Sequence, residues 1–291
     1  MKAPAIADMQ AFVQQHAGLL VITGAGCSTD SGIPAYRDTE GAWMRPPPMT
    51  FQQFMGTEAA RQRYWARSMV GWSMFSGGKP NAAHQALRSL EAKGYTGLLV
   101  TQNVDGLHRQ AGQSRLLELH GSLASVVCMH CNNRLDRLNY QQQLLNENPA
   151  WADMTAVMAP DGDVDLETDF SSFRIPACGR CGGILKPDVV FFGEAVPRAR
   201  VDAVYQALAQ AGAVLVVGSS LMVYSGYRFV RDAARQGKPV AAITLGKTRA
   251  DAVLTLKLNA ACAPLLTALD TVLAQISSEA DGACRDRLAA V

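Results

Sequence analysis

The sequence lacks the long apolar runs and targeting segments that mark several large classes of protein. No apolar stretch among its 291 residues approaches the length of a membrane-spanning helix. The first residues contain no basic stretch followed by an apolar core and no run of arginines, so neither a secretory signal nor a transit peptide is indicated. We therefore expect a cytoplasmic protein with no membrane partner.

Charge of either sign is also scarce. Charged residues make up 18% of the chain, and the formal net charge is only +2. This balance gives no long-range attraction to nucleic acid, although a local basic patch could be hidden in the average. We expect no nucleic-acid partner. The hydrophobic content of 48% is enough for one large domain, with or without a smaller one.

Cysteine is present, but its pattern does not suit a disulfide framework, because the count of seven is odd. Three cysteines are scattered, at Cys27, Cys262 and Cys284. The other four form two C-x-x-C pairs: Cys128, Cys131, Cys178 and Cys181. Two such pairs present four thiolates to one metal ion, and a complete thiolate shell is typical of structural zinc. His130 is interpreted as a bystander, and four unrelated buried cysteines are the alternative.

Short continuous apolar runs predict the strands of a parallel sheet that is covered on both faces. They occur at residues 19–23, 98–101, 189–192, 213–217 and 240–244. Helical patterns lie between them, at residues 81–93, 198–211 and 226–236, and Asn81 suits the N-cap of the first helix. This alternation predicts an α/β fold with a Rossmann-type doubly wound parallel sheet.

Two stretches interrupt the alternation. Residues 38–80 contain Trp43, three consecutive prolines and an aromatic cluster, and we expect them to form a small helical lobe. Residues 122–186 contain both cysteine pairs and a polar, acidic middle, which indicates an inserted, smaller zinc-binding module. The Rossmann-type domain would then comprise residues 1–121 and 187–291.

Small and polar residues follow several of the expected strands, at the sheet edge where ligands bind in open α/β folds. Residues 24–28 (GAGCS) could approach a phosphate, but the third glycine of the usual dinucleotide fingerprint is missing and a tight turn is equally possible. Residues 101–108 (TQNVDGLH) and 218–220 (GSS) allow the same two interpretations. A lone histidine such as His120, in ELHG, is more often structural than catalytic.

In this order, the strings resemble the sirtuin family over roughly residues 18–265. The resemblance rests on GAGCSTDSGIPAYR, TQNVDGLH, ELHG, the two C-x-x-C pairs, LKPDVVFFGE and VVGSSLMVYSG. APDGDVDL and GSSLMVYSGYRF look most like class II sirtuins. The resemblance implies NAD-dependent removal of acyl groups from lysine side chains of proteins or peptides. The products would be nicotinamide, O-acyl-ADP-ribose and free lysine, and one structural zinc ion would be bound per chain.

The resemblance also implies roles for individual residues. His120 would be the general base, and Asn103 would assist it. The acyl-lysine peptide would add as a strand between residues 192–194 and 221–226. The expected NAD contacts are Gly24, Ala25, Gly26, Ser28, Tyr36, Arg37, Gln102, Asn103, Asp105, Gly218, Ser219, Ser220, Thr244, Leu245, Gly246 and Cys262.

The sequence leaves other outcomes open. ADP-ribosyl transfer to protein, or plain NAD hydrolysis, would use the same fold. A zinc-ribbon module that binds nucleic acid is a further rival, disfavoured by the low net charge and by Asn103, Asp105 and His120.

Two hypotheses concern departures from the family pattern. Cys27 replaces a common isoleucine, and a helix N-terminus there would lower its thiol pKa and make it an oxidation sensor; a small buried residue is the alternative. Tyr36 replaces a common phenylalanine. Tyr64 and Arg67 share one face of an expected helix, where Arg67 could favour acidic acyl groups.

Overall fold

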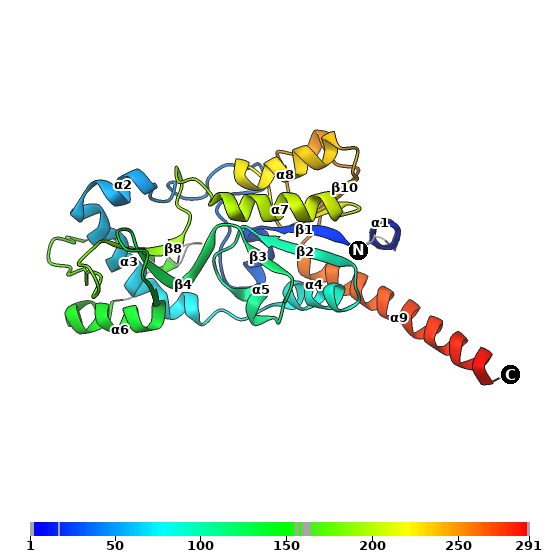
Figure 1. Cartoon of the computed structure of the whole chain (residues 1–291), viewed down its shortest axis with the longest axis horizontal. Coiled ribbons are helices and arrows are strands. Elements are labelled where there is room, and N and C mark those ends of the chain that lie inside the picture. The colour runs from blue at the N-terminus through cyan, green and yellow to red at the C-terminus, as the bar shows by residue number, and fades with distance from the viewer. Residues whose placement is uncertain (1–2, 17, 155–156, 159–163, 167, 290–291) are drawn as a thin grey trace.

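The structure, a computed structural model, describes residues 3–16, 18–154, 157–158, 164–166 and 168–289. Its central element is a six-stranded sheet in the order β11-β10-β9-β1-β2-β3, and each neighbouring pair is parallel (Figure 1). The strands are β1 (Leu19–Thr23), β2 (Thr96–Thr101), β3 (Leu116–Glu118), β9 (Val214–Val217), β10 (Val240–Ile243) and β11 (Leu256–Leu258). The expected parallel sheet is confirmed, with β3 and β11 as additional short edge strands.

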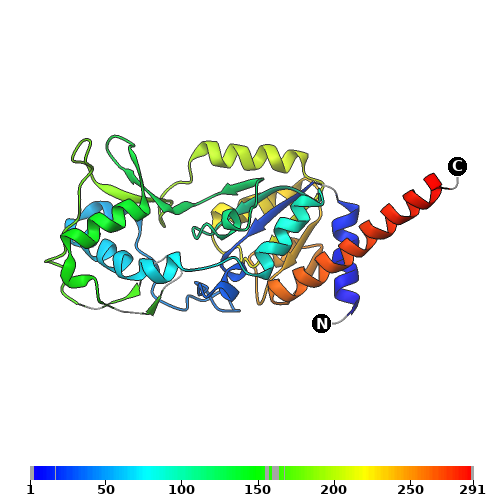
Figure 2. The same ribbon diagram turned by 90° about the horizontal axis from the view of Figure 1, so that it is seen from below.

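Helices cover both faces of this sheet, as a doubly wound fold requires (Figures 1 and 2). Leu19 and Val21 of β1 join a core with α1 (Ala3–Gln15), α4 (Ala82–Ala92) and α9 (Cys262–Ala289). Leu20 and Ile22, which point the other way, join a second core with α7 (Arg198–Gln210) and α8 (Tyr224–Arg235). The continuous apolar runs therefore reflect burial on both faces.

The three expected helices are present, with bounds that differ from the prediction by two residues or fewer. Asn81 is the N-cap of α4, because its side-chain oxygen accepts the N–H of Ala83 at 2.8 Å. The short helix α5 (Leu107–Gln110) follows β2. Directly after β1 the chain forms two short 3-10 turns, η1 (Ala25–Cys27) and η2 (Thr29–Ser31). Another such turn, η4 (Asp251–Val253), precedes β11.

A second region lies at the end of the molecule opposite α9 (Figure 1). It contains α2 (Phe51–Gly56), α3 (Glu58–Ser76), α6 (Arg137–Glu147) and the turn η3 (Pro149–Trp151). An antiparallel sheet, ordered β5-β4-β8, joins β5 (Arg134–Asp136), β4 (Gly121–Cys128) and β8 (Leu185–Val189). A small hairpin of β6 (Val157–Met158) and β7 (Val164–Asp165) completes it.

The small helical lobe and the cysteine-containing insertion share one hydrophobic core. Phe54 and Trp65 of the lobe are fully buried in the same cluster as Leu123 of β4 and Tyr140 of α6. The two stretches that interrupt the alternation in the sequence therefore pack as one body. The exact domain boundaries stay a prediction.

One expected strand is wrong. The run at residues 189–192 is not part of the parallel sheet; β8 ends at Val189 and pairs antiparallel with β4. The following residues leave the strand and are buried by other means: Phe191 packs edge-on against Phe54 at 5.2 Å between ring centroids. A continuous apolar run reports burial, which a loop between two lobes supplies as well as a sheet does.

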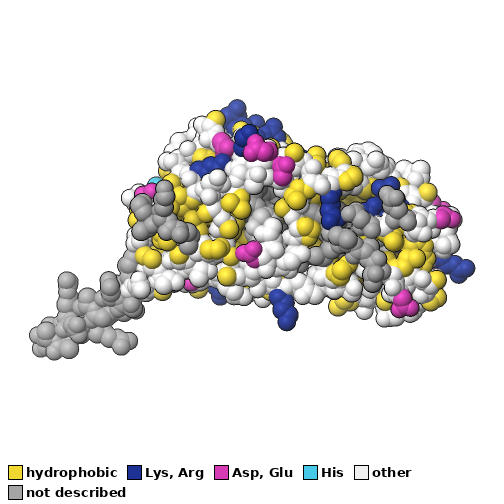
Figure 3. Space-filling view, turned by 180° about the vertical axis from the view of Figure 1, so that it is seen from behind, with side chains coloured by type: hydrophobic (Ala, Val, Ile, Leu, Met, Phe, Trp, Pro, Cys, Tyr) yellow, Lys and Arg dark blue, Asp and Glu magenta, His cyan; other side chains and the backbone are white. Residues whose placement is uncertain are grey.

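Two further observations bear on partners. Among the described residues, no helix is both long and apolar enough to cross a membrane. On the face drawn in Figure 3, acidic and basic side chains are interspersed, and the described Lys and Arg residues do not merge into a broad basic surface. This agrees with the low net charge.

Candidate active site

The parallel sheet has a topological switch point where β1 meets β9, because the chain builds outward from this pair in both directions. A cavity of about 850 Å³ opens at this edge. Its lining includes most of the expected NAD contacts: Gly24, Ala25, Gly26, Tyr36, Arg37, Gln102, Asn103, Gly218, Ser219, Ser220, Thr244, Leu245 and Cys262. His120 and the segments at residues 190–196 and 221–225 line the same cavity. Motifs from distant parts of the sequence therefore line one cavity.

The glycines after β1 and β9 allow two turns to pack directly against each other. A Cβ at Gly26 would lie 2.9 Å from the carbonyl oxygen of Gly218, and one at Gly24 would lie 2.8 Å from Cβ of Ser219. Gly218 has a positive φ of 60°. The N–H of Gly26 donates to Gly218 O at 2.8 Å. We expected these glycines to let the backbone come close to a phosphate. In the structure, they let the turn after β1 pack against the turn after β9.

Polar side chains from the end of β2 fix these turns. Gln102 Nε2 donates to Ser219 Oγ at 2.7 Å, and Asn103 Nδ2 donates to Ser28 Oγ at 3.0 Å. Ser28 Oγ donates in turn to Asp105 Oδ2 at 2.7 Å. Burial raises the pKa of Asp105 above its ordinary value, opposed by the N–H of Leu107 and the hydroxyl of Ser28. Gln102 and Asn103 thus reach the cavity from a fixed scaffold.

Three of the expected NAD contacts are not among the cavity-lining residues: Ser28, Asp105 and Gly246. Ser28 is only 1% exposed, and Asp105 is held by its hydrogen bonds to Ser28 and Leu107. Gly246 packs so closely on Thr39 that a Cβ would collide with the backbone there. Their contact with a nucleotide stays a prediction.

His120 sits at the end of β3, with both ring nitrogens engaged. Nδ1 lies 2.9 Å from the carbonyl oxygen of Gln102, and Nε2 lies 2.8 Å from Ser225 Oγ. A carbonyl only accepts, so Nδ1 carries the proton and Nε2 presents its lone pair. Burial lowers the pKa of His120 below its ordinary value, outweighing the hydrogen bond to Gln102, which raises it. At neutral pH the ring is a neutral base with Nε2 as its basic atom.

Three aromatic rings form one wall of the cavity. Tyr36, Trp43 and Phe192 all line it and meet edge to face, with ring centroids 5.6 to 6.5 Å apart. The guanidinium of Arg37 stacks on Trp43, its Cζ 3.7 Å from the ring centroid. Such a wall excludes water from the polar floor. The sequence interpretation gave Trp43 no site role, and no motif there distinguishes it from other lobe aromatics.

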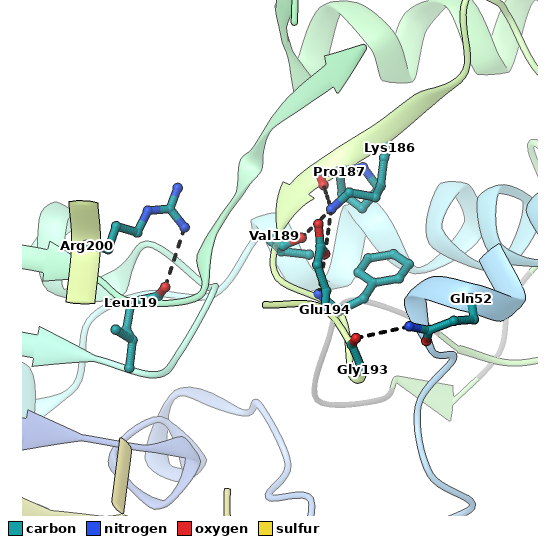
Figure 4. A network of polar contacts seen from close by, with 9 residues as sticks. Gln52, Leu119, Lys186, Pro187, Val189, Gly193, Glu194 and Arg200 are labelled. Atoms are coloured by element: carbon teal, nitrogen blue, oxygen red, sulfur yellow. Dashed lines mark hydrogen bonds and ion pairs between the residues drawn. The ribbon is translucent and has the colours of Figure 1, made fainter. Parts of the chain in front are cut away.

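A buried ion pair holds the segment that borders the cavity after β8 (Figure 4). Lys186 Nζ lies 3.1 Å from Glu194 Oε2, with the lysine side chain only 4% exposed. Glu194 Oε2 also accepts the N–H of Phe191 at 2.9 Å, and Gln52 Nε2 donates to Gly193 O at 3.1 Å. On the other side, Val190 N–H donates to His120 O at 2.7 Å. These contacts fix residues 190–194 beside His120.

Other residues missed in the sequence also line the cavity. Arg228 of α8 is one, and its Nε is buried without a hydrogen-bond partner among the described residues. No motif distinguishes it from other arginines of an amphipathic helix. Tyr64 is buried against Phe191, which lines the cavity, with centroids 5.3 Å apart. Arg67, half-buried on the same helix, is not among the cavity-lining residues that the structure describes, so its role in acyl selection stays untested.

The oxidation-sensor hypothesis for Cys27 fails on its physical premise. The residue lies in a short 3-10 turn and not at the start of an α-helix. It is 1% exposed, and burial raises the pKa of its thiol well above the ordinary value. The sulfur is therefore a protonated, sequestered thiol and not an accessible thiolate.

The four paired cysteines converge as predicted. Cys128 and Cys181 have sulfurs 3.5 Å apart, Cys131 and Cys178 have sulfurs 3.8 Å apart, and all four sulfurs lie within 4.8 Å of one another. Tetrahedral zinc with Zn–S bonds of about 2.3 Å separates its sulfurs by about 3.8 Å, so the set fits that ion. His130 is exposed and is not part of the cluster.

β4 connects the cysteine cluster with His120. Its eight residues run from Gly121 to Cys128, which at about 3.3 Å per residue separates the two by up to roughly 25 Å. The cluster is therefore remote from the cavity. The run APDGDVDL, which resembles class II sirtuins, lies partly outside the described residues.

We compared the chain with protein-family models, curated proteins and solved structures. A model of the Sir2 family matches residues 24–225. An NAD-dependent protein deacetylase of Xanthomonas campestris pv. campestris (strain 8004) is 57% identical over 262 residues, which are 90% of this chain and 89% of that protein. One of Bordetella bronchiseptica is 57% identical over 277 residues, covering 94% and 98%.

Solved structures of lower identity share the fold. A Sir2 protein with a p53 peptide and NAD⁺ superposes with a TM-score of 0.73 at 26% identity, covering 91% of this chain and 96% of the other. A Sir2 structure described for the mechanism and regulation of these enzymes reaches a TM-score of 0.75 at 26% identity, covering 94% and 100%. The matched motifs, the doubly wound sheet and the extent of these similarities agree: the chain belongs to the Sir2, or sirtuin, family.

Proposed function

We propose that this chain is an NAD-dependent protein deacylase that removes acetyl groups from lysine side chains. The observation that carries the proposal is that His120 presents a basic Nε2 in the same cavity as the turns after β1 and β9. The curated relatives that this chain matches over most of their length are named NAD-dependent protein deacetylases. The similarity to Sir2 proteins bound to NAD⁺ or an acetylated peptide supports the same assignment.

The residues fit NAD on the evidence of their donors and shape. Gln102, Asn103 and Ser219 form a polar floor, while Tyr36 and Phe192 form an apolar wall. When bound, NAD would supply an electrophilic ribose carbon that accepts the acyl oxygen as nicotinamide leaves. His120 would remove a proton from a ribose hydroxyl through Nε2, and Asn103 would orient the ribose. The aromatic wall would keep water away, because water at that carbon yields hydrolysis instead of acyl transfer.

The peptide would enter between residues 192–194 and 221–226 and add a strand there. The ion pair of Lys186 and Glu194 supports this, since it fixes one side of that gap. The four-cysteine cluster would hold one structural zinc ion per chain. Three further points belong to the proposal. Residues 122–186 form the zinc-binding module, the chain is a class II sirtuin, and its location is cytoplasmic.

The proposal is tested by the NAD-dependent deacetylation of an acetyl-lysine peptide. Replacing the base in His120→Ala should lower kcat by ~10²–10⁴-fold while zinc content and folding are retained. His16→Ala, at the residue that follows α1 and outside the cavity lining, is the matched histidine control and should keep parental turnover. Parental activity in the His120 variant would remove the base from the mechanism, and no NAD-dependent loss of the acetyl group by the parent would refute the function.

A further inference from the structure

A second cluster of metal-ligating side chains lies directly beneath the turn that follows β1. Cys27, His84 and His108 come from three separate segments: the 3-10 turn η1, the first turn of α4, and α5. Cys27 Sγ and one nitrogen of each histidine lie within 4.8 Å of one another. The three residues are 1%, 0% and 2% exposed. Neither the deacylase chemistry nor the four-cysteine cluster uses them.

Within the described part of the chain, each of the two histidines has one ring nitrogen that is unsatisfied. His84 Nε2 and His108 Nδ1 are buried and have no hydrogen-bond partner among the residues that the structure describes. Buried polar atoms are normally paired, so each orphaned atom requires an explanation. Each ring thus leaves one nitrogen orphaned in a cluster that contains the same buried thiol, and the two ring centroids lie 4.7 Å apart. A ligand that joins all three would satisfy them together.

We propose that Cys27, His84 and His108 form a second, buried metal site that takes one Cu⁺ ion. One thiolate and two imidazoles form a soft donor set that suits copper or zinc. Structural zinc takes four protein ligands, and catalytic zinc completes its shell with water. Among the described residues, this cluster offers three ligand atoms and is closed to solvent, which favours an ion satisfied by two or three ligands. Cu⁺ is the physiological ion with that preference.

The surroundings already orient one of the histidines for such a role. His108 Nε2 lies 2.9 Å from Thr23 Oγ1 at the end of β1. If Nε2–H donates to this hydroxyl, the lone pair of Nδ1 faces the cluster, which is the arrangement that ligating histidines usually have. Burial lowers the pKa of His108 to about 3 and that of His84 to about 4, so both rings are neutral at pH 7 and able to ligate.

His84 has to change its tautomer. Its Nδ1 accepts the N–H of Asn81 at 3.3 Å, which places the proton on Nε2 in the free protein. Copper at Nε2 would move that proton to Nδ1 and give up this long hydrogen bond at the N-cap of α4. The Cys27 thiol would lose its proton to solvent as the Cu–S bond forms, and neither sulfur nor copper changes oxidation state. The bound ion would tie η1, α4 and α5 together below the cavity floor.

The test is a Cu⁺ competition titration of the full-length, zinc-loaded protein against a chromophoric Cu⁺ chelator under anaerobic conditions. We expect one Cu⁺ per chain with the zinc retained. Cys27→Ser should weaken copper binding by about 100-fold or more. Removing only a group that hydrogen-bonds to a metal ligand already lowers metal affinity by about 10–100-fold, and this variant removes a ligand itself. Cys262→Ser, which removes another buried cysteine close to the cluster, is the matched control and should bind copper like the parent.

X-ray absorption at the copper edge gives a readout that does not depend on any variant folding. A ligand shell of one sulfur and two imidazole nitrogens supports the proposal. Sulfur-only scattering, copper uptake matched by zinc release, equal uptake by Cys27→Ser and the parent, or no uptake at all would each overturn it. None of these outcomes bears on the deacylase function, which is measured without copper.

Discussion

At the scale of single residues, the position of a proton decides what the site can do. His120 becomes a base at Nε2 because a backbone carbonyl, that of Gln102, holds the proton on Nδ1. No sequence motif contains this information, because residues 102 and 120 meet only when β2 pairs with β3. The string ELHG identified the residue, and the fold assigns its tautomer.

The buried pair of His84 and His108 predicts how stability depends on pH. Burial lowers the folded-state pKa of His84 to about 4 and of His108 to about 3, against an ordinary 6.5. The unfolded chain binds protons below pH 6.5 and the folded chain does not, so stability is complete above pH 6.5 and is lost as the pH falls. Between pH 8 and pH 5, each histidine should remove about 2 kcal/mol from the free energy of unfolding.

Urea unfolding of the zinc-loaded, copper-free protein at these two pH values measures that change. His84→Gln should show a smaller pH dependence than the parent, by the share of one histidine. His16→Gln, which replaces a half-buried histidine that follows α1 and lies outside the pair of His84 and His108, is the reference and should follow the parent. An unchanged pH dependence in His84→Gln would show that this ring is not buried in its neutral form.

The residue scale also shows where sequence reasoning stopped. Gln102, Asn103 and Ser219 were identified because they follow apolar strand runs, and the carboxyl ends of parallel strands meet at one edge. Ser28 and Asp105 were identified by the same reasoning, but they bond to each other outside the cavity lining. A one-dimensional pattern does not show which of several neighbouring polar side chains faces the cavity.

At the scale of elements, the segment after β8 depends on a charge pair and not on strand pairing. Glu194→Ala would leave the buried ammonium of Lys186 without its carboxylate and free the N–H of Phe191. Breaking a fully buried pair in this way costs about 3–5 kcal/mol of stability. Because the Glu194 side chain is 22% exposed and Lys186 Nζ also donates to Pro187 O and Val189 O, the expected loss lies at the lower end of this range. Because the segment borders the proposed peptide site, KM for the peptide should rise more than KM for NAD.

Thermal and urea unfolding, with steady-state kinetics for each substrate, check this prediction. Asp202→Ala on α7 is the matched control, because Asp202 pairs with Arg198 where the side chains are 55% and 93% exposed. Exposed pairs contribute about 0–1 kcal/mol, so the control should stay close to the parent. Equal losses in the two variants would mean that burial does not strengthen the pair of Lys186 and Glu194.

The four-cysteine cluster leads to a second prediction at this scale. Cys128→Ser should abolish stoichiometric zinc and lower the melting temperature and solubility, because a closed thiolate site contributes directly to folding. The fraction that remains folded should keep its dependence on His120, since the cluster is remote from the cavity. Metal analysis of the parent should find one zinc per chain, and soluble, active parent protein without zinc would contradict the assignment.

The elements differ in how well the sequence predicted them. β1, β9 and β10 were predicted because they are buried on both faces and flanked by turn residues. β3 and β11 have three residues each, too few to produce a pattern. The run at residues 189–192 is continuously apolar but does not form a strand of the parallel sheet. Its apolar character reflects the burial of Phe191 by Phe54 and Tyr64 of the helical lobe.

At the scale of the whole molecule, the cavity lies between two bodies with separate cores. The doubly wound sheet supplies its floor, and the body formed by the lobe and the cysteine module supplies residues 190–194 (Figures 1 and 4). The loop at residues 35–44 carries Tyr36 and Trp43 over the opening. This arrangement brings a dinucleotide-type floor and a peptide-binding edge to a single base, His120.

The proposed function requires that cleavage of NAD is coupled to transfer of the acyl group from the peptide to ADP-ribose. The measurement that tests it most directly is mass spectrometry of all products after reaction of the parent with NAD and an acetyl-lysine peptide. We predict nicotinamide, O-acetyl-ADP-ribose and deacetylated peptide in equal amounts, with no nicotinamide formed above background when the acetyl group is absent. Nicotinamide and ADP-ribose without deacetylated peptide, or a peptide that carries ADP-ribose, would contradict the account and identify the chain as an NAD hydrolase or an ADP-ribosyltransferase.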